Sequence, residues 1–131
     1  MKRVLLLVLL FSGVLLSCSK SESHTSADTS LPGTWKLIET LADPGDGSGT
    51  WQPATQLVTL TFTDGGFIQG NAFPQARRYE VTSDTNIRFT FSDGTFINYN
   101  YTLTDGMLVL SGGGCVEACG AKFKKVSTLH A

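Results

Sequence analysis

Turn-forming residues divide the sequence after residue 31 into short segments. Asp64-Gly65-Gly66, Ser83-Asp84-Thr85, Ser92-Asp93-Gly94 and Thr104-Asp105-Gly106 each place an aspartate beside glycine or another small polar residue. Aspartate and serine form local hydrogen bonds in turns, and glycine accepts the positive φ that tight hairpins require. The segments between these turns are too short for ordinary helices, so the sequence predicts antiparallel strands joined by hairpins.

Apolar and polar residues alternate within these segments, which is the pattern of strands with one buried face. In the first segment the alternation places Trp35 and Glu39 on the same face. Eight strands can close into a barrel whose interior side chains fill it, whereas an immunoglobulin-like sandwich needs longer crossing connections. We therefore predict an all-β domain, an eight-stranded antiparallel up-and-down barrel. Its expected strands are 33–41, 56–63, 67–70, 77–82, 86–91, 95–104, 107–111 and 121–126.

The amino-terminal residues form a charged and then apolar segment that ends at a cysteine. Met1-Lys2-Arg3 precedes an apolar run from Val4 to Leu16, which is too short to span a bilayer stably. The following Ser17-Cys18 completes a Leu-Leu-Ser-Cys sequence that resembles the lipobox of bacterial lipoproteins. The resemblance implies that residues 1–17 are a lipoprotein signal peptide and that acyl chains on Cys18 anchor the protein in a membrane. An uncleaved signal anchor is the alternative.

The chain after the cysteine divides into a tether, a domain and a tail. Residues 18–30 contain no large apolar side chain, so they form the lipidated cysteine and a flexible tether. Residues 31–127 are the expected barrel domain, and 128–131 are a frayed tail. Ser19, rather than aspartate, follows the cysteine, which resembles outer-membrane sorting in enterobacteria. We expect a cell-envelope location, most simply the outer membrane, on either its periplasmic or its surface face.

Charge and residue inventory restrict the function. Removing residues 1–17 takes Lys2 and Arg3 from the 10 basic residues and nothing from the 11 acidic ones, which leaves a formal net charge of −3. This balance argues against a nucleic-acid partner. The sequence has no serine nucleophile motif, and both histidines lie outside the expected strands. We therefore predict neither an enzyme nor a cofactor site.

Four segments carry a family resemblance. Gly33-Thr34-Trp35 resembles the Gly-x-Trp sequence that opens the first strand of lipocalins, and residues 43–51, 115–119 and 122–126 add similarity to small lipocalin-like lipoproteins of Bacteroidetes. In lipocalins this tryptophan closes the barrel beneath a basic side chain from the last strand. The resemblance implies that Gly33 and Trp35 form such a closing motif with Lys122 or Lys124. A small domain of heat-shock-related and motility-related outer-membrane proteins has a similar opening and size and is an alternative.

The remaining cysteines predict a disulfide rather than a metal site. With Cys18 lipidated, Cys115 and Cys119 are left as a pair in an oxidising compartment, which favours a bond between them. Zinc would need two more ligands, and no histidine lies nearby in the sequence except His130 in the expected tail. The loop that contains Asp43 and Asp46 lacks the ligand spacing of a calcium loop, so we predict no metal.

Two functions fit such a domain. In the first, the barrel binds a small apolar or amphipathic ligand, with Trp51 at the mouth after a glycine-rich loop. The candidate lining residues are Val58, Leu60, Phe62, Ile87, Phe89, Phe91, Tyr99 and Tyr101. In the second, the barrel is solid and the loops around Trp51 and Cys115–Cys119 bind an envelope protein, as in an interaction or inhibitor module. The two functions differ in whether these side chains leave a cavity.

Overall fold

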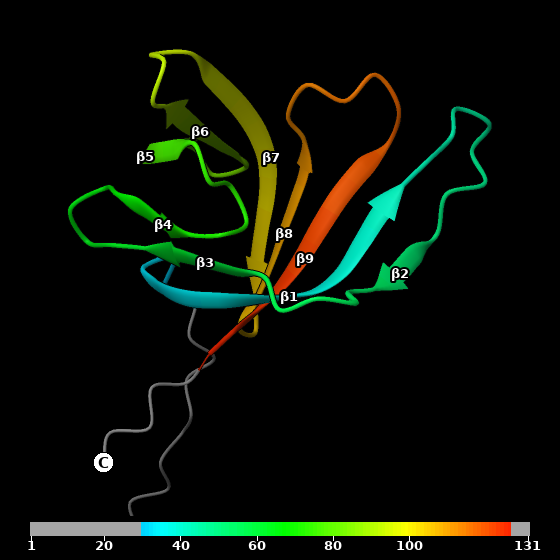
Figure 1. Cartoon of the computed structure of the whole chain (residues 1–131), viewed down its shortest axis with the longest axis horizontal. Coiled ribbons are helices and arrows are strands. Elements are labelled where there is room, and N and C mark those ends of the chain that lie inside the picture. The colour runs from blue at the N-terminus through cyan, green and yellow to red at the C-terminus, as the bar shows by residue number, and fades with distance from the viewer. Residues whose placement is uncertain (1–29, 127–131) are drawn as a thin grey trace, which may run out of the picture.

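The computed structural model describes residues 30–126, and these residues form nine strands and no helix (Figure 1). The strands are β1 (Gly33–Ala42), β2 (Trp51–Pro53), β3 (Thr59–Phe62), β4 (Ile68–Gly70), β5 (Ala76–Ser83), β6 (Asn86–Phe91), β7 (Phe96–Thr104), β8 (Met107–Gly112) and β9 (Cys119–Lys125). They pair antiparallel in the order β4-β3-β1-β9-β8-β7-β6-β5. This order is an up-and-down meander of eight strands, which confirms the predicted fold class.

The ninth strand arises because the second strand of the barrel is divided. Residues 51–53 of β2 pair with 39–41 of β1, and residues 59–62 of β3 pair with 33–36 of the same strand. Two hydrogen bonds continue the ladder between the two pieces. Leu37 N–H donates to the Val58 carbonyl, and Ala54 N–H donates to the Ile38 carbonyl. The predicted strands do not include residues 51–53. Only these three residues pair with β1, and so short a segment shows no alternation in the sequence.

The sheet nearly closes between β4 and β5. Phe67 and Arg78 form an isolated antiparallel bridge, and Tyr79 N–H donates to the carbonyl of Gly66 at 3.0 Å. The Tyr79 hydroxyl also donates to the carbonyl of Thr63 at 2.7 Å. These contacts join the two ends of the sheet through a few residues, so the barrel is shut along one part of this seam only.

A β-bulge in β1 changes which face its side chains occupy. The register between β1 and β9 shifts between Leu37, opposite Phe123, and Glu39, opposite Lys122. Phe123 is buried, so its neighbour Lys122 points outward, because successive strand residues point to opposite faces. Glu39 therefore lies on the outer face, and the predicted shared face of Trp35 and Glu39 is wrong. The extra residue, Ile38, inverts the alternation.

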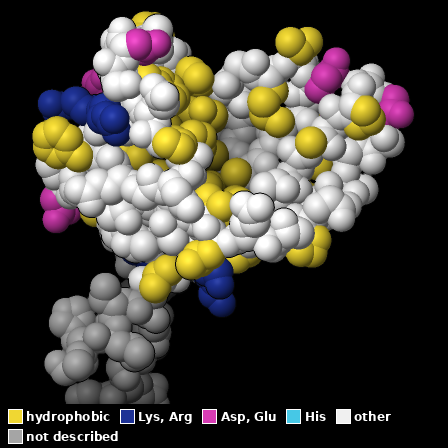
Figure 2. All heavy atoms as spheres, in the orientation of Figure 1, with side chains coloured by type: hydrophobic (Ala, Val, Ile, Leu, Met, Phe, Trp, Pro, Cys, Tyr) yellow, Lys and Arg dark blue, Asp and Glu magenta, His cyan; other side chains and the backbone are white. Residues whose placement is uncertain are grey.

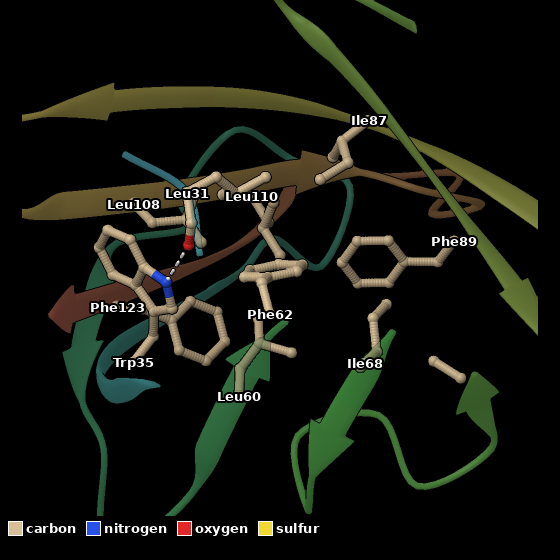
Figure 3. Packing of buried hydrophobic residues seen from close by; sticks show 11 residues of the cluster. Leu31, Trp35, Leu60, Phe62, Ile68, Ile87, Phe89, Leu108, Leu110 and Phe123 are labelled. Atoms are coloured by element: carbon tan, nitrogen blue, oxygen red, sulfur yellow. Dashed lines mark hydrogen bonds between the residues drawn. The ribbon is translucent and has the colours of Figure 1, made fainter. Parts of the chain in front are cut away.

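Trp35 closes one end of the barrel. It is fully buried, and its indole N–H donates to the carbonyl of Leu31 at 2.9 Å (Figure 3). The amine Nζ of Lys125 lies 5.2 Å from the centroid of the Trp35 ring. The side chain of Lys125 reaches the ring across Gly33, where a Cβ would lie 2.8 Å from its Cε. Gly33 has a φ of 131°, a conformation that favours glycine.

The basic residue over Trp35 is thus Lys125, rather than Lys122 or Lys124 as the resemblance implied. Lys125 is opposite Trp35 in the ladder and shares the inward face with Phe123, two residues earlier. Lys122 and Lys124 flank Phe123 and point outward. The closing motif is present, and its cation comes from the next inward position.

Aromatic and aliphatic side chains fill the interior above Trp35. Edge-to-face contacts connect Phe62 to Tyr79 and Phe89, with ring centroids 4.7 and 5.9 Å apart. The fully buried side chains are Trp35, Leu60, Phe62, Ile87, Phe89, Leu108 and Phe123 (Figure 3). The lower barrel is therefore packed with side chains and is not an empty calyx.

Both ends of the described chain lie at the closed end. Lys125 Nζ donates to the carbonyl of Ser30 at 2.7 Å, and Val126 N–H donates to the carbonyl of Thr34 at 2.8 Å. The whole buried cluster lies between Leu31 and Phe123, so the described segment contains its own core. The expected signal peptide, the lipidation site Cys18 and the tail lie outside the described residues. Within residues 30–126 no helix is long and apolar enough to cross a membrane.

Candidate ligand-binding groove

The open end of the barrel contains an apolar groove of ≈ 240 Å³. Figure 2 shows a hollow at this end of the molecule, with hydrophobic side chains on its walls. Residues from four strands, β1, β7, β8 and β9, and from two loops line the groove. They are Leu41, Phe73, Tyr99, Leu110, Cys115, Cys119 and Ala121, with glycines 112, 113 and 120. No described lining residue is a lysine, arginine, histidine, aspartate or glutamate. The groove thus offers an uncharged surface.

Phe73 forms an aromatic wall of the groove together with two inward-facing strand residues. Its ring centroid lies 5.1 Å from that of Phe89 and 5.6 Å from that of Tyr99. The connection between β4 and β5 directs Phe73 inward because the Asn71 carboxamide is held against β3, accepting a hydrogen bond from Thr59 N–H at 2.7 Å. Phe73 was not among the predicted lining residues. The available signal was a single aromatic residue in the connection 71–75, which carries no strand pattern.

Tyr99, one of the residues that line the groove, carries a hydroxyl group. No residue that the structure describes is hydrogen-bonded to the Tyr99 hydroxyl, although its ring packs tightly. Burial raises the pKa of Tyr99 above the ordinary tyrosine value, so the hydroxyl stays protonated at neutral pH. It can therefore both donate a hydrogen bond to a bound molecule and accept one.

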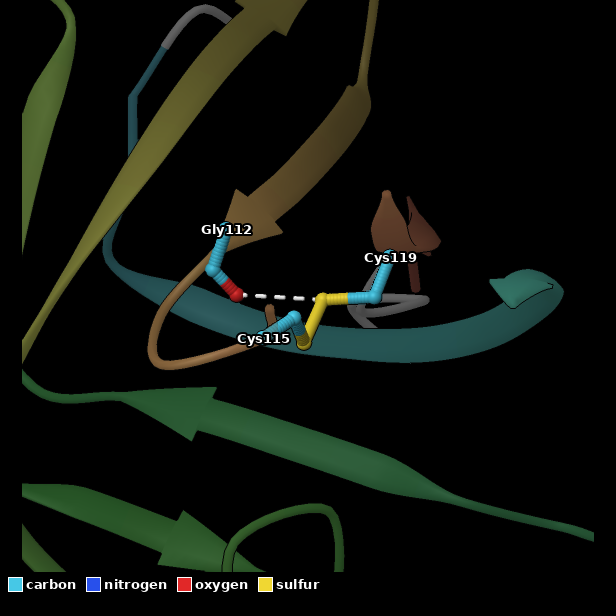
Figure 4. Close-up of a disulfide and its surroundings, with 3 residues drawn as sticks. All are labelled: Gly112, Cys115 and Cys119. Carbon is cyan, nitrogen blue, oxygen red and sulfur yellow. Dashed lines mark hydrogen bonds between the residues drawn. A yellow bond between two sulfur atoms is a disulfide. The ribbon is translucent and has the colours of Figure 1, made fainter. Parts of the chain in front are cut away.

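A disulfide loop forms one side of the groove. Cys115 and Cys119 are bonded, with Cα atoms 6.2 Å apart, as the sequence predicts (Figure 4). Sγ of Cys119 lies 3.2 Å from the carbonyl oxygen of Gly112, where the chain leaves β8. Gly112, Gly113 and Gly114 all have positive φ values, which turn the chain sharply into the loop. The bond thus holds the wall at a point where the backbone has few other contacts.

The predicted lining residues are distributed between the groove and the core. Of the eight strand residues, Tyr99 lines the groove. Leu60, Phe62, Ile87 and Phe89 are buried in the packed interior, and Phe91 and Tyr101 are half-buried against it. Val58 borders a separate hollow of ≈ 370 Å³ beside the gap between β2 and β3. The structure therefore brings most of these side chains together, but as core.

Trp51 lies on the outer face of the barrel, not over its mouth. Its indole rests on Gly120, where a Cβ would lie 2.8 Å from the ring. The amine Nζ of Lys122 lies 4.5 Å from the Trp51 ring centroid, and the same amine forms a salt bridge with Glu39. These side chains attach β2 to β9 across β1. The prediction that Trp51 lies at the mouth of the barrel is therefore wrong.

The loop between β1 and β2 is ordered by its own aspartates. The Asp43 carboxylate accepts hydrogen bonds from the N–H groups of Gly45, Asp46, Gly47 and Gly49, at distances of 2.7 to 3.2 Å. These donors lower the pKa of Asp43, with the Gly45 N–H making the largest contribution. Among residues 30–126 no group of three or more His, Cys, Asp or Glu side chains could hold a metal ion.

Comparison with known proteins found no family model and no curated protein that matches this sequence. The geometry of the groove therefore carries the functional argument.

Proposed function

We propose that this chain is a lipid-anchored cell-envelope protein whose barrel mouth binds a small, uncharged, apolar or amphipathic ligand. The groove carries the proposal, because its apolar lining includes Tyr99, whose hydroxyl makes no hydrogen bond to a described residue and could pair with a ligand. A charged ligand group would lose its water here without gaining a partner of opposite charge, which is unfavourable. A neutral ligand with one polar group, such as an alcohol, ester or amide, suits these contacts.

The size of the groove limits the ligand. Ligand pockets usually measure about 300–1,000 Å³, and this groove measures ≈ 240 Å³ above a filled interior. The groove therefore accommodates one ring or a short alkyl chain, while the rest of a larger ligand stays outside. This differs from a carrier that encloses its ligand deep in the barrel.

The lipobox-like sequence at Cys18 supports membrane anchoring, and the position of the chain ends is consistent with it. Residue 30 lies at the closed end beside Lys125, whereas the groove is at the opposite end. A tether leaving from residue 30 would keep the mouth unobstructed. We expect the protein to incorporate radiolabelled palmitate in bacterial cells and the Cys18→Ser variant to incorporate none. Labelling of the serine variant would refute acylation at this cysteine.

A neutral fluorescent probe tests the groove directly. Residues 19–131 contain the complete core and are suited to the experiment. We expect N-phenyl-1-naphthylamine to bind saturably at one site. Ala121→Leu should weaken binding at least tenfold, because leucine fills the groove. Thr102→Leu adds the same side chain on the exposed outer side of β7 and should leave the affinity unchanged. No saturable binding, or equal affinity of both variants, would contradict the proposal.

A second candidate function is an envelope interaction or inhibitor module. The filled barrel interior favours it, as does Val116, which is 97% exposed at the tip of the disulfide loop. This module would leave the groove empty of small ligands. Two results together would favour this alternative: the probe does not bind the wild-type protein, and an envelope protein that binds the wild type does not bind Val116→Ser.

A further inference from the structure

Two exposed phenylalanines and two arginines lie in two adjacent rows on the outer face of the sheet between β4 and β7. Phe67 bridges Arg78, Arg78 is opposite Thr90, and Thr90 is opposite Phe96 in the ladder. Phe67 is 49% exposed and Phe96 is 57% exposed. Arg88, one row away on β6, completes what we term the arginine–phenylalanine surface, defined by Phe67, Arg78, Arg88 and Phe96. Figure 2 shows basic side chains beside hydrophobic ones on the side of the molecule that carries β4 and β5.

The arginines lie over the aromatic rings. The guanidinium carbon Cζ of Arg78 is 5.0 Å from the Phe67 ring centroid, and that of Arg88 is 4.5 Å from the Phe96 ring centroid. Each contact is a cation–π arrangement that orients the guanidinium while leaving hydrogen-bond donors at its edge. Each pair therefore presents an apolar ring next to a positioned cation.

The guanidinium groups of Arg78 and Arg88 form no salt bridge with any residue between 30 and 126, although Arg88 Nε donates to Asn98. Glu80 is opposite Arg88 in the ladder and still makes no ion pair with it. All three arginines beyond the amino terminus, at 77, 78 and 88, lie on β5 and β6. A local basic surface thus exists on a domain that is acidic overall.

We propose that the arginine–phenylalanine surface docks on a bilayer containing anionic phospholipids. Guanidinium groups bind phosphate through paired hydrogen bonds, and the phenylalanine rings beside them would enter the boundary between headgroups and acyl chains. The charge is complementary to an anionic leaflet, and the lipid anchor of the proposed function would hold the domain near one. The proposal rests on that anchor only for proximity, since the surface itself is independent of it.

Vesicle co-sedimentation of residues 19–131, which lack the acylated cysteine, separates this proposal from anchoring and from groove binding. We expect retention on vesicles that contain phosphatidylglycerol, release at high salt and little retention on pure phosphatidylcholine. Because each arginine near an anionic surface contributes about fivefold to the partition coefficient, Arg78→Gln/Arg88→Gln should reduce binding by about twentyfold or more. Phe67→Ser/Phe96→Ser should reduce binding without changing its salt dependence.

The control removes the same charge elsewhere. Lys36 and Lys124 are exposed partners in the ladder between β1 and β9, and Lys36→Gln/Lys124→Gln should leave retention nearly unchanged. Equal losses in the two charge variants would overturn the proposal, as would equal retention on both vesicle types. Tight binding of polyglutamate without vesicle binding would also overturn it and assign the surface to an acidic protein. Unchanged thermal unfolding of the variants excludes loss of fold as the cause.

Discussion

The ring of Tyr99 packs directly against the backbone of Gly113, so closely that a Cβ at residue 113 would lie 2.0 Å from the ring carbon Cε1. This contact joins β7 to the disulfide loop and sets the position of the only groove side chain with a hydroxyl. A side chain at residue 113 could be accommodated only if the Tyr99 ring moved, because all three nearest atoms belong to that ring. The glycine is therefore a determinant of groove shape.

Gly113→Ala should destabilise the domain more than Gly114→Ala does. Both residues have positive φ, 75° and 92°, so alanine costs about 1–2 kcal/mol at either position. Only residue 113 adds a clash with Tyr99, since nothing lies within 4 Å of a Cβ at residue 114. Overpacking adds about 1–3 kcal/mol. Urea unfolding measures the difference, and equal midpoints for the two variants would show that Tyr99 adapts freely.

Replacing Trp35 should separate its packing from its hydrogen bond. Trp35→Ala leaves a cavity at the closed end and should cost about 3–5 kcal/mol. Trp35→Phe keeps an aromatic ring but removes the N–H that binds the Leu31 carbonyl, at a cost of about 1–3 kcal/mol. Chemical denaturation gives both values. A phenylalanine variant as stable as the wild type would mean that the Leu31 carbonyl finds another donor.

The disulfide should contribute to both stability and groove affinity. The loop closed by Cys115 and Cys119 is short, so the chain-entropy model gives about 2 kcal/mol. Cys115→Ser/Cys119→Ser should lower stability by about this amount and weaken probe binding, because the groove wall is released. A dithiol reductant should shift the wild type to the same values and leave the variant unaffected. If the reductant lowered the stability of the variant by the same amount, its effect on the wild type could not be assigned to the Cys115–Cys119 bond.

Asp43 should make stability depend on pH in the acid range. Its pKa is lower in the folded protein than the ordinary aspartate value of 3.8, because four backbone N–H groups, that of Gly45 foremost, donate to its carboxylate. Its contribution is fully present above the unfolded pKa and is lost as pH falls through the folded pKa. The difference in Tm between wild type and Asp43→Asn should therefore be largest near neutrality and shrink below about pH 4. A difference that stays as large well below the ordinary pKa of 3.8 as it is near neutrality would mean that the charge is not what orders the loop.

Local sequence determined the strands and the turns. Asp64-Gly65-Gly66 and Ser92-Asp93-Gly94 are turns by their own chemistry, and alternation in a segment such as 86–91 assigns its inward face without reference to any partner. The disulfide followed similarly, from the two cysteines that remain when Cys18 is taken as lipidated and the compartment as oxidising. The sequence also allows the lysine over Trp35 to be predicted, because alternation about Phe123 excludes Lys122 and Lys124 from the inward face and leaves Lys125.

Only the tertiary structure decided which side chains line the groove. The bulge at Ile38 depends on how β1 matches β9, and it moves Glu39 outward into a salt bridge with Lys122. Phe73 enters the mouth because Asn71 binds β3, a contact across twelve residues of sequence. Such pairings depend on surfaces that exist only after the barrel closes. Periodicity along one strand therefore cannot distinguish the filled core around Phe62 from the open groove beside Tyr99.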